Sequence, residues 1–423
     1  MHRKYRTVAA SVLYSISAAF CCAPLASHVH LVDLHVYRMG GDAVLHGLSL
    51  YGTRYAGQLP FTYPPFAALL FTCLAWLPWL TAAVLMTALT VAAVPAMLYL
   101  ALQLPPSPVR GQRAAWDLAL AAGAAVIWLE PVHSTLFYGQ VDVFIACAVL
   151  YDLTLPDTSP VKGVAIGLAA AFKLTPALFV VYLFLTRRYR AAATAAAVFA
   201  ASVALGFAFL PAASASFWDL SFLRPGRVSP PQNAQNQSLL GALARSLHSA
   251  SVAGPWLILA TSVAVTGLVL AVRAWRRGDH ARGFALCAVT ELLISPISWT
   301  HHWVLAVPAL LLAIVAICRN RAQRPLAASA AGTAVTAIAV VAWAQVARHV
   351  PNGDWLRLPL SAMVTSEIYV IIGLGVLVAA AVSEIIGCTR TKPVRPAASR
   401  ASETASPVIV DSYCPQRVSN YPR

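Results

Sequence analysis

The chain has 423 residues, of which 59% are hydrophobic and 11% are charged, and its mean hydropathy is +0.70. A soluble domain carries about a quarter charged residues, so this composition excludes an ordinary soluble protein. The net charge of +15 comes from basic residues in short spacers between apolar blocks. That is the pattern of cytoplasmic loops, and it argues against a nucleic-acid-binding protein.

Apolar blocks of about twenty residues recur along the chain, and this is the helix length that crosses about 30 Å of hydrocarbon. We therefore predict an all-α polytopic membrane protein with about twelve transmembrane helices and both termini in the cytoplasm. The predicted spans are 7–26, 80–102, 114–128, 140–154, 160–172, 176–186, 190–211, 252–273, 282–297, 303–318, 325–346 and 366–387. The first block resembles a secretory signal peptide, but its apolar run is longer than usual for one, and we expect it to be retained.

Segment 64–78 is apolar but short, and prolines bracket it at both ends. We predict an interfacial or re-entrant helix here, because counting it as a crossing would invert everything downstream. With this choice most of the 30 Lys and Arg residues fall on the cytoplasmic side, as expected for cytoplasmic loops. The spans 160–172 and 176–186 are too short to cross unaided, so they are candidates for half-helices.

The last part of the chain differs from the rest in composition. Residues 389–423 are rich in Pro, Ser, Thr and Arg and offer little to bury. We expect them to form a disordered cytoplasmic tail beyond a membrane domain at 1–388.

On this topology nearly every polar cluster lies on the non-cytoplasmic side. The clusters hold carboxylates, cations, imidazoles, amides and phenols: Asp33, His35, Tyr63, Glu130, Tyr138, Gln140, Asp142, Lys173, Arg227, Asn236, Gln237, His301 and His302. The middles of the spans are almost entirely Ala, Val, Leu and Ile, apart from Glu291. A transporter would more naturally place ionisable groups at mid-span and show repeat symmetry, so the pattern favours an enzyme at the membrane surface.

Each cluster also has a structural interpretation. Asp33 is consistent with a solvated loop, the Pro-aromatic run around Tyr63 with an interfacial anchor, and Lys173 with a side chain that reaches the lipid headgroups. His301 and His302 do not predict a metal site, because adjacent histidines on a helix point about 100° apart and no carboxylate follows at a suitable spacing. We therefore expect neither a metal nor another cofactor.

Six motifs between about residues 29 and 318 resemble a known family in their order and content. They are Val32-Asp33-Leu34-His35-Val36-Tyr37, Pro60-Phe61-Thr62-Tyr63-Pro64-Pro65-Phe66, Glu130-Pro131 through Ser134-Thr135 to Tyr138-Gly139-Gln140, Lys173-Leu174-Thr175-Pro176, Asn236-Gln237-Ser238 and Ser295-Pro296-Ile297-Ser298-Trp299-Thr300-His301-His302-Trp303. The set resembles the actinobacterial polyprenol-phosphate-mannose-dependent α-(1→2)-mannosyltransferases, which are glycosyltransferase family 87 enzymes of the GT-C membrane class. The last quarter of the chain carries no motif of that family.

The resemblance implies a GT-C architecture and an inverting transfer of mannose from a polyprenyl-phosphate-mannose donor. The acceptor would be the 2-hydroxyl of a mannose on a mannosylated lipid: a phosphatidylinositol mannoside, lipomannan or lipoarabinomannan, which the motifs do not separate. The site would face the extracytoplasmic side of the plasma membrane, among membrane lipids and without nucleic acid. No DxD pair is present for a metal–nucleotide donor, and none is expected with a lipid-phosphate donor.

The resemblance also implies roles for single residues. Asp33 occupies the position of the family's catalytic base, and His302, or His301 beside it, resembles the histidine near the donor phosphate. Lys173 and Arg227 are candidate phosphate partners by charge. Glu130, Tyr138, Gln140 and Asn236 are candidates to hold sugar hydroxyls, and His35, Tyr63 and Gln237 complete the predicted substrate-binding set. Two alternatives stay open: transfer of a pentose such as arabinose from a polyprenyl-phosphate donor, and a lipid or solute transporter.

Overall fold

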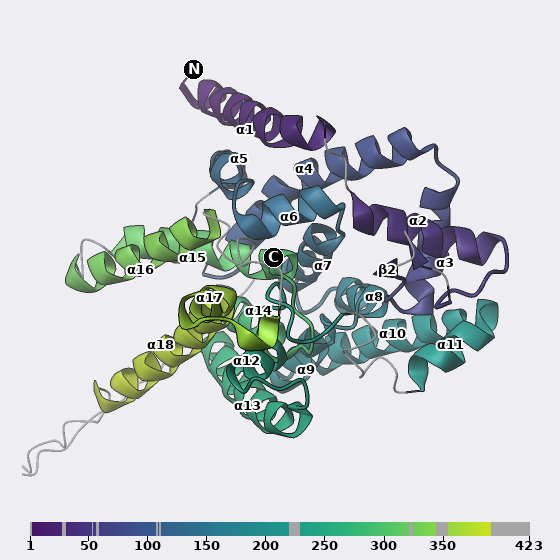
Figure 1. Cartoon of the computed structure of the whole chain (residues 1–423). Coiled ribbons are helices and arrows are strands. Elements are labelled where there is room, and N and C mark those ends of the chain that lie inside the picture. The colour runs from purple at the N-terminus through teal and green to yellow at the C-terminus, as the bar shows by residue number, and fades with distance from the viewer. Residues whose placement is uncertain are drawn as a thin grey trace, which may run out of the picture. The chain divides into compact units, whose positions relative to one another are not determined.

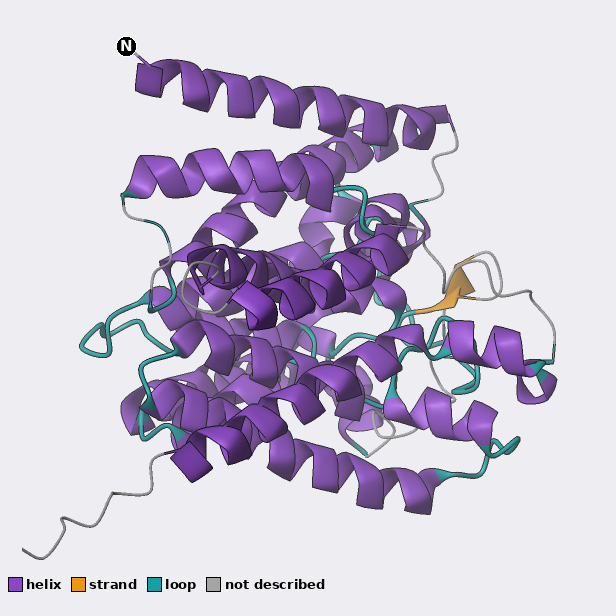
Figure 2. Cartoon of the chain, turned by 90° about the vertical axis from the view of Figure 1, so that its left-hand side faces the viewer, coloured by secondary structure: helices purple, strands orange, loops and turns teal. Residues whose placement is uncertain are grey.

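The computed structural model describes residues 2–27, 31–52, 54–55, 59–106, 109, 111–219, 229–320, 325–343 and 354–390. Figures 1 and 2 show that most of these residues are helical. The chain divides into one compact unit at Met1–Ala381 and a second at Val382–Arg423. Every contact discussed below lies within the first unit. Most of the predicted tail at 389–423 lies outside the described residues.

Helices of very different lengths follow one another along the chain. They are α1 (His2–Ser27), α2 (Val32–Leu45), α3 (Pro65–Ala75), α4 (Trp79–Gln103), α5 (Gln112–Val126), α6 (Glu130–Tyr138), α7 (Asp142–Thr154), α8 (Val164–Phe172), α9 (Ala177–Leu185), α10 (Tyr189–Phe209), α11 (Pro211–Trp218), α12 (Leu239–Ser246), α13 (Ala253–Arg276), α14 (His280–Ile294), η3 (Thr300–Ala306), α15 (Val307–Asn320), α16 (Pro325–Trp343), η5 (Trp355–Arg357), α17 (Leu360–Ser366) and α18 (Ile368–Arg390). Within the described residues one antiparallel pair of two-residue strands interrupts them, β1 (Arg54–Tyr55) and β2 (Leu59–Pro60).

Each segment predicted to span the membrane is helical over most of its length, and the all-α membrane fold is confirmed. The predicted number of spans is not. Among the described residues six helices are long and apolar enough to cross, and the pair α5 and α6, bent by 78°, would make a seventh. Most of the difference arises because α7, α8, α9 and α14 have only 13, 9, 9 and 15 residues, shorter than the roughly 20 that a crossing needs.

Several segments between the predicted membrane spans also contain helices. Residues 27–65 include α2, and residues 212–251 include α12 and most of α11. Close packing stabilises the first: a Cβ added at Gly41 of α2 would lie 2.3 Å from the carbonyl oxygen of Phe71 in α3. The helix predicted at 64–78 is α3, and its 11 residues are too few to span a bilayer.

Breaks between helices carry the polar motifs. Helix α6 ends at Gly139, whose φ of 72° suits glycine and whose added Cβ would lie 3.0 Å from the Cβ of Leu34. The chain also leaves helical geometry at Lys173, with φ of −145°, and again after Ile294. Irregular backbone at membrane depth is tolerated where it lines a cavity, so these breaks are natural places for a site.

A buried arginine fixes one of the loops around that site. Arg245 of α12 is fully buried and pairs with Glu367 at 2.6 Å. It also donates to the carbonyl oxygens of Asn233 (2.6 Å) and Asn236 (3.0 Å). The residues before α12 are thereby tied to the start of α18.

Candidate active site

A cavity of about 700 Å³ brings together residues from five distant parts of the chain. Seven of the predicted site residues line it: Asp33, Tyr63, Tyr138, Gln140, Lys173, His301 and His302. They come from α2, the segment before α3, the α6–α7 break, the residue after α8, and η3. Polar motifs that are scattered along the sequence therefore meet at one place.

Asp33 is held by a chain of hydrogen bonds that starts at two tyrosines. Gln140 Nε2 donates to Asp33 Oδ2 over 2.7 Å. The hydroxyls of Tyr37 and Tyr63 both donate to Gln140 Oε1, over 2.6 and 3.1 Å. Because its oxygen is held by two phenols, the Gln140 amide must present its nitrogen to the carboxylate.

The surroundings of Asp33 suit a proton acceptor. Burial raises the pKa of its carboxyl to about 6, while the Gln140 hydrogen bond and the Lys173 charge act in the opposite direction. Burial also raises the pKa values of Tyr37 and Tyr63 well above their usual range, so both phenols stay protonated. Among the described residues Asp33 Oδ1 makes no hydrogen bond, which leaves this oxygen for a substrate hydroxyl.

Lys173 is the one lysine or arginine among the described residues that line the cavity. Its ammonium lies 2.6 Å from Asp142 Oδ1 at the start of α7 and 5.7 Å from the centre of the Tyr63 ring. Both partners of the ion pair are buried, with side chains 13% and 7% exposed. A buried ammonium with a single carboxylate partner keeps donors for a further anion.

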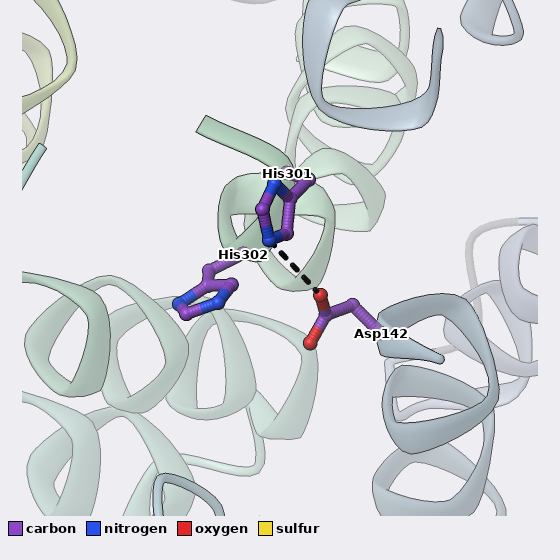
Figure 3. Close-up of side chains that lie close together, drawn as sticks. All are labelled: Asp142, His301 and His302. Atoms are coloured by element: carbon purple, nitrogen blue, oxygen red, sulfur yellow. Dashed lines mark ion pairs between the residues drawn. The ribbon is translucent and has the colours of Figure 1, made fainter. Parts of the chain in front are cut away.

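The two histidines of η3 lie against the same carboxylate. His301 Nε2 is 3.9 Å from Asp142 Oδ2, and Figure 3 shows this carboxylate facing both rings. The rings of His301 and His302 are 4.7 Å apart and inclined by 78°. Tyr138 packs edge-on against His301 at 5.6 Å. The sequence around the histidines does not indicate Asp142, because this carboxylate comes from another helix.

Four predicted substrate-binding residues do not line the cavity. His35 stacks on Trp79 with ring centres 3.7 Å apart, and Glu130, fully buried, accepts a hydrogen bond from the hydroxyl of Tyr369. Asn236 accepts a hydrogen bond from the backbone of Ser298, and Gln237 donates to the carbonyl oxygen of Ser366. These contacts position the walls of the site. Arg227 lies outside the described residues.

The structure adds cavity residues that were not in the predicted set. Glu291 of α14 lines the cavity, and its Oε2 atom is buried without a hydrogen-bond partner. Its sequence signal was visible, since it is the lone carboxylate within an apolar span. Tyr37 also lines the cavity, and its sequence signal was its place at the end of the first of the six motifs.

Together these groups supply a carboxylate base, a cation and imidazoles around one space. Such a set can remove a proton from a hydroxyl while it steadies an anionic leaving group. A retaining sugar transfer would need a second carboxylate as nucleophile, whereas an inverting transfer needs one base.

Comparison with known proteins agrees with this chemistry. Residues 61–296 match the model of glycosyltransferase family 87. A Mycobacterium tuberculosis protein described as a polyprenol-phosphate-mannose-dependent alpha-(1-2)-phosphatidylinositol mannoside mannosyltransferase is 36% identical, over 66% of this chain and 69% of its own length. A pentamannoside mannosyltransferase of the same species is 37% identical over 75% and 74%, and a mannoside mannosyltransferase of Mycolicibacterium smegmatis is 34% identical over 82% and 84%. No solved structure matches the chain at a significant level. The chain therefore belongs to glycosyltransferase family 87, and it is a glycosyltransferase of the membrane.

Proposed function

We propose that this enzyme transfers mannose from polyprenyl-phosphate-mannose to the 2-hydroxyl of a mannose on a lipid-anchored glycan. The observation that carries the proposal is Asp33 in one cavity with Lys173 and the histidine pair, in a chain of family 87. The relatives named for phosphatidylinositol mannosides support that class of acceptor.

In the proposed reaction Asp33 acts as the general base. Its free Oδ1 accepts the proton of the acceptor 2-hydroxyl as that oxygen attacks the anomeric carbon of the donor mannose. The bond from this carbon to the phosphate oxygen breaks on the opposite face, so a β-linked donor gives an α-linked product. Gln140 holds the other carboxylate oxygen, which keeps Oδ1 directed at the acceptor.

The departing polyprenyl phosphate needs positive charge or hydrogen-bond donors. Lys173 supplies an ammonium at the cavity wall, and His301 and His302 lie beside it. Tyr63, Tyr138 and Gln140 are the cavity residues suited to sugar hydroxyls. Arg227 is a further candidate phosphate partner. We assign His35, Glu130, Asn236 and Gln237 to positioning of the cavity walls, on the contacts described above.

We infer a GT-C architecture in which the six spans and the shorter buried helices together make about twelve membrane segments. The distribution of basic residues in the spacers supports a cavity on the extracytoplasmic side of the plasma membrane. A lipid-phosphate donor and a lipid acceptor both reside in the bilayer, so a cavity among the broken helices suits their chemistry.

The test is transfer by the purified full chain supplied with polyprenyl-phosphate-mannose and a phosphatidylinositol mannoside. The expected product carries one added α-(1→2)-linked mannose, identified by mass spectrometry and NMR. Asp33→Asn should lower the rate by about 10²–10⁴-fold, the usual contribution of a general base.

Asp42→Asn is the matched control, because Asp42 lies on the same helix, is exposed and pairs at the surface with His46. It should transfer at the normal rate. Full activity of Asp33→Asn would exclude Asp33 as the base. A pentose in the product, when both donors are supplied, would favour the alternative donor.

A further inference from the structure

Among the described residues, Asp142, His301 and His302 each carry a buried polar atom without a hydrogen-bond partner. These atoms are Asp142 Oδ2, His301 Nε2 and His302 Nδ1. The ligand atoms that the three residues offer lie within 4.8 Å of one another, on α7 and η3 (Figure 3). Buried polar atoms nearly always have a hydrogen-bond partner, so three neighbouring residues that each carry an unpartnered atom require an explanation.

Neighbouring contacts fix what these atoms can do. Lys173 binds Asp142 Oδ1, which leaves Oδ2 as a lone-pair donor toward His301. The His302 ring lies beside the His301 ring, with ring centres 4.7 Å apart. Each neutral imidazole has one nitrogen with a lone pair that can bind a metal.

We propose that Asp142, His301 and His302 bind one divalent transition-metal ion, with Zn²⁺ as the ion that best suits two imidazoles and a carboxylate. In a tetrahedral site, ligands about 2.1 Å from the metal lie roughly 3.4 Å apart. The ligand atoms of this cluster lie within 4.8 Å of one another, so side-chain movement must shorten the longest separation by at most about 1.4 Å. Three protein ligands leave a fourth position for an oxygen from the cavity.

The charges of the cavity give the ion a use. Lys173 is already bonded to Asp142, and the carboxylates Asp33 and Glu291 also line the space. The one cation that lines the cavity among the described residues is therefore already shared with a carboxylate when the phosphate departs. A divalent ion at the histidines would stabilise that phosphate oxygen. The binding site stands on its geometry, whereas this use rests on the proposed function.

The test is the metal content of the full chain, purified in detergent with an affinity tag that contains no histidine. Inductively coupled plasma mass spectrometry should find about one Zn²⁺ per chain after incubation with the ion and desalting. Asp142→Asn and His301→Ala should each lower this content at least tenfold. The matched control is Glu291→Gln, which changes a buried cavity carboxylate outside the cluster and should retain the metal.

Replacement of Zn²⁺ by Co²⁺ provides a second measurement. The wild-type protein should show visible Co²⁺ absorption bands, and His302→Ala should lack them. Size-exclusion profiles check that each variant is folded. Asp142→Asn, His301→Ala and His302→Ala are all expected to lose the metal, so the test still holds if one of them does not fold. No bound Zn²⁺ or Co²⁺ in the folded normal chain would overturn the site. Equal loss of metal in Glu291→Gln would also overturn it.

The metal site and the mannosyl transfer can fail separately. Bound metal without mannosyl transfer would reject the proposed function and keep the site. Mannosyl transfer at an unchanged rate in a chelator, by a chain freed of its metal, would reject the use of the ion in the reaction and keep the proposed function. In that case Lys173 and the N–H groups of the neutral histidines would remain as partners of the phosphate.

Discussion

Helix α7 carries a buried aspartate near each end, and the two are held in opposite ways. Asp152 accepts hydrogen bonds from the backbone nitrogens of Gly163, Ala165 and Ile166, at 2.8 to 3.3 Å, where α8 begins. Asp142 receives one hydrogen bond, from Lys173, and its second oxygen has no partner. The carboxylate of Asp152 therefore has hydrogen bonds to both oxygens, whereas the carboxylate of Asp142 has one oxygen without a hydrogen bond.

Whether a buried carboxylate has hydrogen bonds to both oxygens distinguishes a structural residue from a functional one better than its burial does. A carboxylate whose oxygens are all satisfied holds two elements together. An incompletely satisfied carboxylate in a cavity is available to a ligand, and perturbed ionisable groups of this kind concentrate at functional sites. Lys162 and Lys173 differ in the same way. Lys162 bonds the carbonyl oxygen of Leu155 and pairs with Asp157 at 3.2 Å, whereas Lys173 lines the cavity.

In the comparison of the two ends of α7, the larger effect on transfer is expected from removing the cavity cation. Lys173→Met should lower the rate of transfer by about 10²–10³-fold, the usual cost of losing one group that stabilises transition-state charge. Lys162→Met removes a lysine of similar burial at the other end of α7 and should leave the rate per folded molecule unchanged. Initial rates of both variants, normalised to the monodisperse fraction, make the comparison. Similar losses in the two would mean that any buried lysine is needed for the fold, and the contrast would fail.

Replacement of the saturated aspartate should act on stability instead. Asp152→Asn keeps one acceptor oxygen but loses the charge that four hydrogen-bond contacts share, and we expect a cost of about 2 kcal/mol. Thermal unfolding in detergent should show a lower midpoint, while the turnover of the folded fraction stays normal. A loss of turnover at an unchanged midpoint would place Asp152 in the chemistry.

Sequence alone predicted the helices wherever physical chemistry leaves no alternative. An apolar block in lipid must satisfy its backbone hydrogen bonds internally, so all twelve blocks are helical. The short helices α2, α11 and α12 escaped prediction because packing, not composition, stabilises them. The number of crossings depends on how short helices are stacked and tilted, which periodicity does not contain.

The polar clusters that form the cavity could be predicted from the sequence. Which of their side chains line the cavity, and which contact one another, could not. Glu130 and Gln140 lie ten residues apart and are both polar residues in an apolar chain, yet Gln140 lines the cavity and Glu130 bonds Tyr369. Which way a side chain turns depends on the bend between helices, here the break at Gly139. The pairing of Asp142 with Lys173 joins two helices and has no local signature.

The smallest effect is expected from changes in the pKa of Asp33, the proposed base. Like Asp142, Asp33 has one hydrogen-bonded oxygen, and the pKa of its carboxyl is about 6. A general base must be deprotonated, so the rate should fall as the pH drops through about 6 and level off above it. The limb of kcat/KM reports the free enzyme. A rate independent of pH between 5 and 8 would contradict this assignment.

Gln140→Met tests the origin of that limb, because the Gln140 hydrogen bond lowers the pKa of Asp33. Without it the carboxylate loses stabilisation, its pKa rises, and the acid limb of kcat/KM should move to higher pH. Tyr63→Phe is the control: it removes a donor to Gln140 Oε1 but keeps the bond between the Gln140 amide and Asp33, so the limb should move less. A limb that moves to lower pH in Gln140→Met would mean that a group other than Asp33 carries the titration, since loss of a hydrogen bond to a carboxylate can only disfavour its charged form.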